Sequence, residues 1–269
     1  FLNWAMDRYP ATNYALIMDD HGDGLGGGMI DSTLKKDQLT LNEIQIALLP
    51  AVSTYQKLDV LYMHACLMGL IEDGYEFRDF AKYYVASEDV AWAYDQGITD
   101  TLEKITKGTS ERDLAIAFMN YYAHEVDKER SNYTMSVVDL GYAESMKDAV
   151  DNFASELNFG ISGKAAKIWL IRKSLVQKFP SRLQDRLGSK DVYIDLYHFV
   201  KLVKEKFNDV AVKNAAQNLM DEIDNYVVFD RNSISLPNAH GVSIFFPDIK
   251  SSYYNGENYD FASDIDWLV

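Results

Sequence analysis

The order of apolar and polar positions divides the chain into two parts that differ in their pattern. In the first hundred residues, short apolar runs at 12–20, 58–63 and 83–87 indicate buried strands. Between them, Thr40-Leu-Asn-Glu43 has the pattern of a helix start in which two side chains bind each other's backbone N–H groups, and residues 71–80 predict a further helix. Strands that alternate with helices predict an α/β fold, with a mostly parallel sheet flanked by helices on both faces.

In the second part of the chain, apolar residues recur at helical spacing, so the C-terminal half is expected to be largely helical. Two strand-like segments interrupt it, at 133–139 and 241–247. We therefore expect three regions: an α/β core at 1–100, a mainly helical region at 101–229, and at 230–269 a strand that returns to the core sheet, followed by a tail. The predicted helices of the second region are 111–126, 143–157, 164–179, 192–207 and 212–227.

Composition and charge narrow the possible partners. The 269-residue chain has a formal net charge of −15, so a nucleic-acid backbone would be repelled. No run reaches the ~18 uninterrupted apolar residues that a membrane helix needs. A single cysteine excludes an internal disulfide. The chain opens at Phe1 with neither a methionine nor a visible signal peptide, which suggests a mature or trimmed form.

Two reactive side chains follow the first two predicted strands. His21 comes directly after the first, and Cys66 follows the second. The carboxyl ends of parallel strands meet at one edge of a sheet, where α/β proteins place their sites. A cysteine acts as a nucleophile when a base, often a histidine, accepts the proton of its thiol. The alternatives are a buried core cysteine, and a turn histidine held by Asp19, Asp20 or Asp23.

The remaining motifs argue against a bound cofactor. The acidic run at 19–23 lacks the later glutamate of a calcium-binding loop. The chain has no Gly-Lys-Ser/Thr phosphate loop, no Gly-x-Ser-x-Gly motif and no cysteine pair for structural zinc. We therefore expect no metal and no cofactor, and we leave a calcium requirement open.

Several blocks of the chain resemble, in order, those of the clostripain family of bacterial cysteine peptidases. The resemblance implies a caspase-like α/β fold, and caspases also place a histidine about 50 residues before their cysteine. It implies that Cys66 attacks the peptide carbonyl, that His21 is general base and acid, and that the backbone N–H groups of Gly22 and Cys66 bind the oxyanion. The blocks are Tyr14-Ala-Leu-Ile-Met-Asp-Asp-His21-Gly-Asp-Gly, His64-Ala-Cys66-Leu-Met-Gly, Tyr83-Tyr-Val-Ala-Ser87-Glu, Asp195-Leu-Tyr-His-Phe199 and Gly241-Val-Ser-Ile-Phe-Phe-Pro247.

The same resemblance implies a substrate and a maturation step. Family members cleave after a basic residue, Arg or Lys, and often cut themselves at such a residue between the His and Cys blocks. The glycine-rich segment 22–38 has the composition of a mobile surface loop and carries Lys35 and Lys36, so we predict self-processing there. The implied partner is a peptide or protein substrate. The implied location is extracellular or in the bacterial cell envelope.

Two departures from the family pattern qualify this interpretation. The family usually has an acidic residue two positions before the cysteine, where this chain has His64. Three roles are open for His64: a second imidazole in the site, part of the pocket wall, or a histidine of the core. An imidazole cannot pair with a guanidinium as a carboxylate does, so Glu88, Asp89 or Asp95 would have to supply the charge of the specificity pocket. The family's early strands are missing, which would expose one sheet edge unless an N-terminal fragment of the same precursor covers it. The alternative function is a catalytically weak or inactive relative that binds peptides or partners.

Overall fold

The computed structural model describes residues 1–31, 33, 37–93, 98–129, 131–158, 164–180, 191–247 and 261. Most of the strands and helices that the sequence predicts are present, with differences that are set out below. In chain order the elements are α1 (Leu2–Arg8), β1 (Ala15–Asp19), the 3-10 turn η1 (Gly24–Gly26), β2 (Gly28–Asp31), β3 (Asp37–Leu39), α2 (Leu41–Thr54), β4 (Leu58–His64), α3 (Ile71–Phe77), β5 (Ala81–Ala86), α4 (Ile98–Lys104), α5 (Glu111–Lys128), β6 (Thr134–Asp139), the 3-10 turn η2 (Leu140–Tyr142), α6 (Ala143–Asn158), α7 (Ala165–Leu170), the π-helical turn η4 (Ile171–Leu175), β7 (Lys178–Phe179), β8 (Tyr193–Asp195), α9 (Leu196–Lys206), α10 (Val210–Tyr226), β9 (Val227–Asn232) and β10 (Ser243–Phe245).

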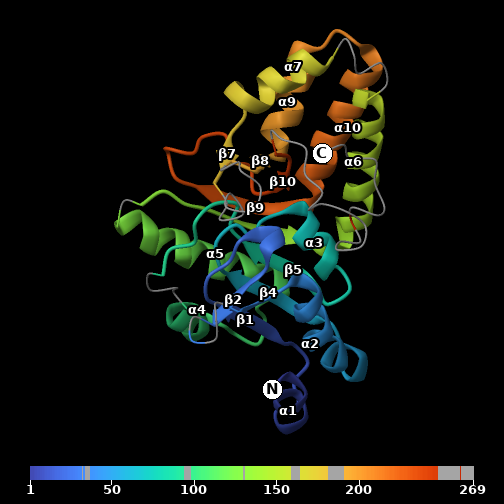
Figure 1. Cartoon of the computed structure of the whole chain (residues 1–269). Coiled ribbons are helices and arrows are strands. Elements are labelled where there is room, and N and C mark those ends of the chain that lie inside the picture. The colour runs from blue at the N-terminus through green and yellow to red at the C-terminus, as the bar shows by residue number, and fades with distance from the viewer. Residues whose placement is uncertain are drawn as a thin grey trace.

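A five-stranded sheet in the order β1-β4-β5-β6-β9 lies at the centre of the described part of the chain (Figure 1). β4 pairs in parallel with β1 and with β5, whereas β6 runs antiparallel to both β5 and β9. All strands except β6 therefore point the same way, which confirms the mostly parallel sheet. The strand expected at 133–139 is present as β6, and β9 crosses the boundary that we drew at residue 229. β1 and β9 are the two edges of this sheet.

Helices cover both faces of the core sheet, as predicted. On one face, Val60 and Tyr62 of β4 pack with Val85 of β5 against buried side chains of α5. On the other face, Leu61 and Met63 belong to a larger apolar core that includes side chains from α2, α3, α6 and α10. β4 is buried along its whole length, because strands flank it on two sides and helices cover it on the other two. The strand that leads to Cys66 is thus fixed from every side.

The helix start predicted at Thr40 is confirmed in detail. The backbone N–H of Thr40 donates to Oε2 of Glu43 (2.9 Å), and the Thr40 hydroxyl oxygen accepts the backbone N–H of Glu43 (3.2 Å). The two residues thereby satisfy donors that a helix N-terminus leaves free. α2 begins at the next residue and connects the region after His21 to the strand before Cys66.

A second sheet, in the order β10-β8-β7, differs from the prediction for the C-terminal strand. The strand expected at 241–247 is β10, and it pairs with β8 instead of returning to the core sheet. It touches the core through Ser243, whose backbone N–H donates to the carbonyl oxygen of Gly69 (2.9 Å). The C-terminal strand therefore supports the segment that follows Cys66 without joining the sheet that carries it.

Two predicted helices are also shorter than their apolar spacing indicates. The helix expected at 192–207 begins only at Leu196, because Asp195 accepts the N–H of His198 and caps it, and the residues before it form β8. The helix expected at 164–179 ends in the η4 turn. In this turn the guanidinium of the buried Arg172 binds the backbone carbonyls of Asp191 and Phe246.

The glycine-rich segment after His21 is more ordered than its composition predicts. Residues 22–28 are buried, and β2 and β3 form an antiparallel pair. Gly27 has a φ of +83°, and a Cβ at this position would collide with the carbonyl group of Leu39. Glycine is thus needed here for close packing and not only for flexibility.

Helix α3 carries three buried acidic side chains, Glu72, Asp73 and Glu76. Oε1 of Glu72 accepts the backbone N–H of Phe245 (2.9 Å). Burial raises the pKa of Glu72 to about 8 and the pKa of Asp73 well above its ordinary range. The low polarity around α3 therefore favours the neutral form of these two carboxyls.

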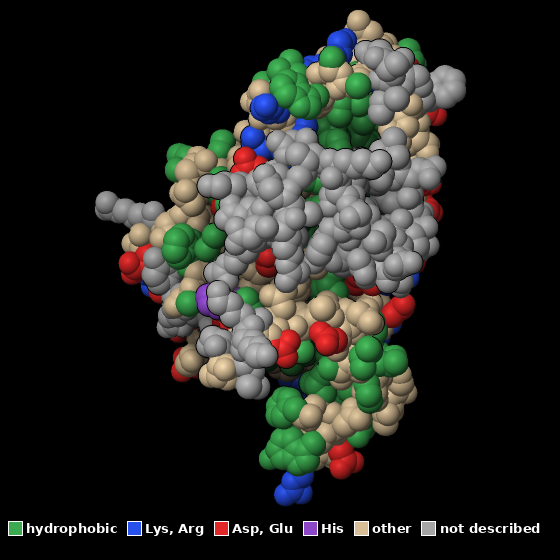
Figure 2. All heavy atoms as spheres, in the orientation of Figure 1, with side chains coloured by type: hydrophobic (Ala, Val, Ile, Leu, Met, Phe, Trp, Pro, Cys, Tyr) green, Lys and Arg blue, Asp and Glu red, His purple; other side chains and the backbone are tan. Residues whose placement is uncertain are grey.

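The surface shows the acidic character that the sequence predicts. Red carboxylates are spread over the lower and middle part of the face in Figure 2, whereas most of the blue lysine and arginine side chains lie near the upper end, around α7. Among the described residues, no helix is long and apolar enough to cross a bilayer. The same residues contain no group of three or more His, Cys, Asp or Glu side chains arranged to hold a metal ion.

Candidate active site

The register of β1 and β4 sets the positions of His21 and Cys66. Asp19 ends β1 and His64 ends β4, and the two residues are paired across the parallel ladder. His21 and Cys66 each follow two residues later, so they leave the same edge of the sheet at matching positions. The structure thus brings together the two strand ends that the sequence singled out.

Gly22 lies directly against the cysteine segment. A Cβ on Gly22 would be 2.5 Å from the carbonyl oxygen of Cys66 and 2.9 Å from the Cβ of Ala65. Only a glycine lets the backbone after His21 approach the backbone of Cys66 so closely. His21 itself is exposed, and its imidazole makes no hydrogen bond to any residue that the structure describes.

The loop after His21 is anchored by Tyr193, from a distant part of the chain. The Tyr193 hydroxyl donates to the carbonyl oxygen of Asp23 (2.8 Å) and accepts the backbone N–H of Leu25 (3.2 Å). Tyr193 is fully buried in the second sheet. No local pattern marks it as part of the site, because it falls in a segment whose spacing predicts a helix.

A tight turn, Cys66–Gly69, follows β4 and is bound by the residues after β5. The N–H of Leu67 donates to the carbonyl oxygen of Asp89 (3.0 Å), and the N–H of Gly69 donates to that of Ser87 (2.8 Å). Leu67 has a φ of +66°, a left-handed conformation that costs a leucine free energy. The turn keeps this conformation because hydrogen bonds from Leu67 and Gly69 to the residues after β5 hold it.

The thiol of Cys66 faces the chain that runs on from β5. Cys66 is half-buried and forms no disulfide, and its Sγ donates to the carbonyl oxygen of Ala91 (3.6 Å). The next residue, Trp92, donates its backbone N–H to the Tyr122 hydroxyl (2.9 Å) and its indole N–H to the carbonyl oxygen of Asn132 (2.6 Å). The first of these bonds joins Trp92 to Tyr122, whose phenol lies near the thiol. Sequence reasoning missed them because an aromatic residue in a helix or loop usually indicates packing.

His64 is paired with a carboxylate beneath the site. The side chain is 2 % exposed, and its Nδ1 lies 2.6 Å from Oδ1 of Asp19. The rings of Tyr62 and Tyr122 meet the imidazole edge-on, at centroid distances of 5.7 and 5.3 Å. Nε2 has no hydrogen-bond partner among the described residues. Because a carboxylate only accepts, this contact assigns the proton to Nδ1 and leaves Nε2 as a buried atom with unused hydrogen-bonding capacity.

The acidic residues expected to serve a specificity pocket lie in different surroundings. Glu88 is 1 % exposed, and its Oε2 accepts the N–H of Gly241 (2.9 Å) on the side of the second sheet. Asp89 is half-buried, and burial raises the pKa of its carboxyl. Asp95 lies outside the described residues, and so do the predicted processing residues Lys35 and Lys36.

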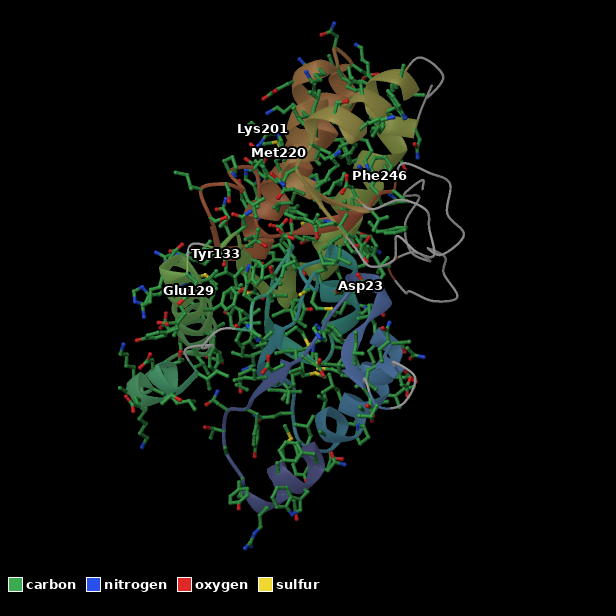
Figure 3. All side chains as sticks on the ribbon, turned by 60° about the vertical axis from the view of Figure 1, so that its left-hand side comes forward. Asp23, Glu129, Tyr133, Lys201, Met220 and Phe246 are labelled. Atoms are coloured by element: carbon green, nitrogen blue, oxygen red, sulfur yellow. The ribbon has the colours of Figure 1, made fainter. Side chains whose placement is uncertain are left out.

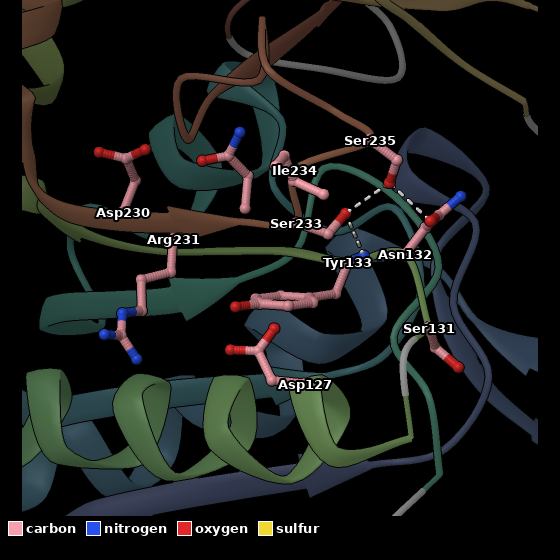
Figure 4. Close-up of a pocket in the computed structure, with 10 residues that line it drawn as sticks. Asp127, Ser131, Asn132, Tyr133, Asp230, Arg231, Ser233, Ile234 and Ser235 are labelled. Carbon is pink, nitrogen blue, oxygen red and sulfur yellow. Dashed lines mark hydrogen bonds between the residues drawn. The ribbon is translucent and has the colours of Figure 1, made fainter.

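A polar groove of ≈ 590 Å³ lies along the same edge of the sheet, between the end of α5, the start of β6 and the end of β9 (Figure 4). Tyr133 and Asp127 face each other in it, and burial together with the Asp127 carboxylate raises the pKa of Tyr133 to about 12. The backbone carbonyl of Asn132 in the groove accepts the indole N–H of Trp92, which connects the groove to the segment that the thiol contacts. In Figure 3, Tyr133 and Asp23 of the His21 loop lie on opposite sides of the view.

The arrangement agrees with comparisons to known proteins. The model of the clostripain family matches residues 1–268. This chain belongs to the clostripain family. Clostripain of Hathewaya histolytica is 25 % identical over a 303-residue alignment that covers 94 % of this chain and 56 % of that protein. The chain therefore spans only about half the length of this curated clostripain.

Solved structures of the clostripain family share the fold. A secreted C11 cysteine protease from Bacteroides thetaiotaomicron, in complex with an irreversible peptide inhibitor, has a TM-score of 0.69 at 16 % identity, over 99 % of this chain and 76 % of that one. An inactive zymogen C11 protease from Parabacteroides distasonis has a TM-score of 0.65 at 14 % identity, over 99 % of this chain and 72 % of that one. These similarities confirm the caspase-like α/β fold that the sequence blocks predict.

Proposed function

We propose that this member of the clostripain family is a cysteine endopeptidase with His21 and Cys66 as its catalytic dyad. The observation that carries the proposal is the pairing of Asp19 with His64, since both candidate residues follow this pair at matching positions. The close approach of Gly22 to Cys66 supports it, because it joins the two segments at the point where a substrate carbonyl has to bind. The fold shared with a secreted C11 cysteine protease that was solved with an irreversible peptide inhibitor supports it as well.

The proposed mechanism uses this chain's own groups only. The thiol of Cys66 passes its proton to His21, and the thiolate forms a bond to the substrate's carbonyl carbon. The backbone N–H groups of Gly22 and Cys66 bind the oxyanion. The imidazolium of His21 then protonates the leaving amine as the C–N bond breaks, which leaves a thioester on Cys66. Water gives a proton to His21, attacks the thioester and releases the acid, and the proton returns to the sulfur.

Basic specificity is the finer part of the proposal, and among the described residues Asp89 is its acidic partner. The carbonyl of Asp89 binds the N–H of Leu67, next to Cys66. Burial raises the pKa of the Tyr122 phenol, and the thiol and the Asp89 carboxyl both lie close enough to add to the rise. The pKa of Asp89 is raised by burial, and an arriving guanidinium would favour the ionised form again. Glu88 is too enclosed to share this role, whereas Asp95 remains a candidate outside the described residues.

Maturation and surroundings complete the proposed function. Self-processing after Lys35 or Lys36 would cut the connection between β2, which ends at Asp31, and β3, which begins at Asp37. N-terminal sequencing of active protein tests this step, and an intact chain that hydrolyses substrate would contradict it. We also propose export from a bacterial cell, and an N-terminal fragment of the same precursor that pairs with the edge of β1.

The decisive experiment is covalent labelling of Cys66 by peptidyl electrophiles that carry Lys, Arg or an uncharged residue before the reactive group. Mass spectrometry of the labelled peptide identifies the modified residue. Labelling by the Lys and Arg probes supports the full proposal, and labelling by the uncharged probe alone keeps the peptidase but rejects basic specificity. If the folded protein reacts with no probe, the result supports the alternative, a catalytically weak or inactive relative that binds peptides or partners.

A further inference from the structure

Glu88 has its side chain in a buried junction behind the cysteine turn. Its carboxyl lies near the carboxyl of Asp195, close enough for Asp195 to raise the pKa of Glu88, and both residues are at most 1 % exposed. Two buried carboxyl groups this near each other disfavour the state in which both are charged, so one of them tends to carry a proton. Oε2 of Glu88 accepts the N–H of Gly241 (2.9 Å), and Oε1 is a buried atom with no hydrogen-bond partner among the described residues.

The other bonds in the junction assign this proton to Glu88. Asp195 accepts the backbone N–H of His198 and the backbone N–H of His240, each at 2.6 Å. Nδ1 of His240 lies 3.2 Å from Oδ1 of Asp195 and 3.0 Å from the carbonyl oxygen of Asn238, so it faces two acceptors and must be the donor. Asp195 thus receives three donors and Glu88 only one. A proton on Glu88 completes both sets of bonds.

The junction is connected to the cysteine turn from two directions. On one side, the residues next to Glu88 accept the backbone N–H groups of Leu67 and Gly69. On the other side, the chain that begins at Gly241 reaches Ser243, whose N–H and hydroxyl both donate to the carbonyl oxygen of Gly69 (2.9 and 3.2 Å). Glu88 is the residue that joins these two supports, because its backbone belongs to the first and its carboxyl binds the second.

We propose that Glu88, in its protonated form, is a positioning residue that holds the Cys66–Gly69 turn in the geometry its chemistry requires. It acts through Asp195 and Gly241 and touches no substrate. The proposal rests on the function proposed above, since it assigns a role within the same site. Loss of the proton would place two like charges in contact in a buried space, and the two supports of the turn would separate.

The charged groups around the junction agree on the direction of this effect. Burial and then the carboxyl of Asp195 raise the pKa of Glu88 well above its ordinary range, and Asp230 of β9 adds to the rise. Burial alone would lower the pKa of His240, but its contacts with Asp195, Asn238 and Asp230 raise it. His198 has a pKa lowered by burial. Asp224 of α10 and Tyr197 of α9, whose ring stacks on that of His240 at 4.6 Å, both have pKa values raised by burial. Protonated Glu88 therefore keeps a second negative charge away from Asp195.

The experiment compares Glu88→Gln and Glu88→Leu with the wild type. The Gln side chain donates to Asp195 and accepts from Gly241 without a titrating proton, whereas Leu makes neither bond. The first readout is the rate at which iodoacetamide alkylates Cys66, measured from acidic to alkaline pH. The second is kcat/KM on a peptide substrate. Glu72→Gln is the matched control, because it also replaces a buried, neutral carboxyl but one that binds Phe245.

We expect the Gln variant to match the wild type at acidic pH and to exceed it at alkaline pH, where the wild type loses its proton. We expect the folded Leu variant to lose kcat/KM by up to about a hundredfold, the cost of about 1 Å of misplacement. Coincident pH profiles of Gln variant and wild type would overturn the proposal, even if the Leu variant does not fold. Alkylation needs no peptidase, so a pH effect without peptide hydrolysis would leave the positioning role standing and reject the proposed function.

Discussion

The Tyr84 hydroxyl donates a 2.8 Å hydrogen bond to the carbonyl oxygen of Met68, inside the turn that follows Cys66. Both residues are buried, so no water replaces this bond if it is lost. We expect Tyr84→Phe to lower the free energy of unfolding by about 1–3 kcal/mol, since the carbonyl is left without a donor. We also expect slower labelling of Cys66. Chemical denaturation and labelling rates measure the two effects.

A matched control exists on α10. Tyr226 is as deeply buried as Tyr84, but its hydroxyl has no hydrogen-bond partner among the described residues. Tyr226→Phe removes the same atom from a similar position without breaking a bond, so we expect no loss of stability. Equal destabilisation by both substitutions would show that the bond to Met68 contributes nothing.

Gly22→Ala tests whether the two strand ends must touch. The new Cβ would meet the backbone oxygen of Cys66 at 2.5 Å, and a backbone atom cannot move aside as a flexible side chain can. We expect the variant to fold with a loss of about 1–3 kcal/mol in stability and to lose peptide hydrolysis by about 10²-fold. Gly108→Ala is the control, because a Cβ there meets no atom within 4 Å. A Gly22→Ala enzyme with wild-type kcat/KM would refute this account of the site.

If His21 and Cys66 form the catalytic dyad, replacing either residue should abolish peptide hydrolysis and leave the folded structure intact. Cys66→Ala removes the nucleophile, and His21→Ala removes the base that takes its proton. Cys66 is half-buried and His21 is exposed, so we expect the free energy of unfolding of both variants to lie within about 0.5 kcal/mol of the wild-type value. We expect neither variant to cleave peptides or to process itself. Residual cleavage by Cys66→Ala, measured with a fluorogenic peptide, would mean that another residue is the nucleophile.

Asp89→Asn tests the acidic partner of a basic substrate residue. The substitution keeps the size of the side chain but removes the charge that pairs with a guanidinium. We expect kcat/KM to fall for Arg and Lys substrates and to change little for a substrate with an uncharged residue at that place. Asp79→Asn serves as control, because Asp79 is exposed before β5, at the opposite edge of the sheet. An unchanged preference for basic residues would transfer this role to Asp95.

Glu72 predicts a particular dependence of stability on pH. Its pKa is raised from 4.5 to about 8 by burial, so between these values the folded protein keeps a proton that the unfolded chain has lost. Unfolding then releases a proton, and the free energy of unfolding falls as pH rises through this window. Glu72→Gln has no such proton. We expect its melting temperature, relative to the wild type, to rise between pH 4.5 and 8 and then to level off. Parallel curves for the two proteins would contradict the raised pKa.

Much of the core could be predicted because local pattern and long-range structure agree there. The apolar run of β4 and the reciprocal Thr40–Glu43 bonds depend on neighbours in sequence, and both are confirmed. The start of α9 was misplaced because one buried side chain, Asp195, decides where the helix begins, and helical spacing does not show burial. The second sheet was missed for a related reason, since β7 and β8 are only two and three residues long.

The site divides in the same way. His21 and Cys66 stand out because glycines and a strand end mark them. Tyr193 and Asp195 reach the site from about 130–170 residues further along the chain, a separation that pairing across sheets decides and no local pattern records. The surroundings of Glu88 were equally hidden, because its sequence neighbours at a strand end suggest an open pocket and not a buried junction.

The buried carboxyls of α3 and of the junction behind the cysteine turn make the net charge of the folded protein differ from that of the unfolded chain. Burial raises the pKa values of Glu72, Asp73 and Glu88, to about 8 for Glu72, so the folded state favours the protonated form of each carboxyl more than the unfolded chain does. Folding therefore takes up protons from the solvent. The formal charge of −15 describes the unfolded chain, and the native molecule migrates in an electric field as a less acidic particle than its sequence implies.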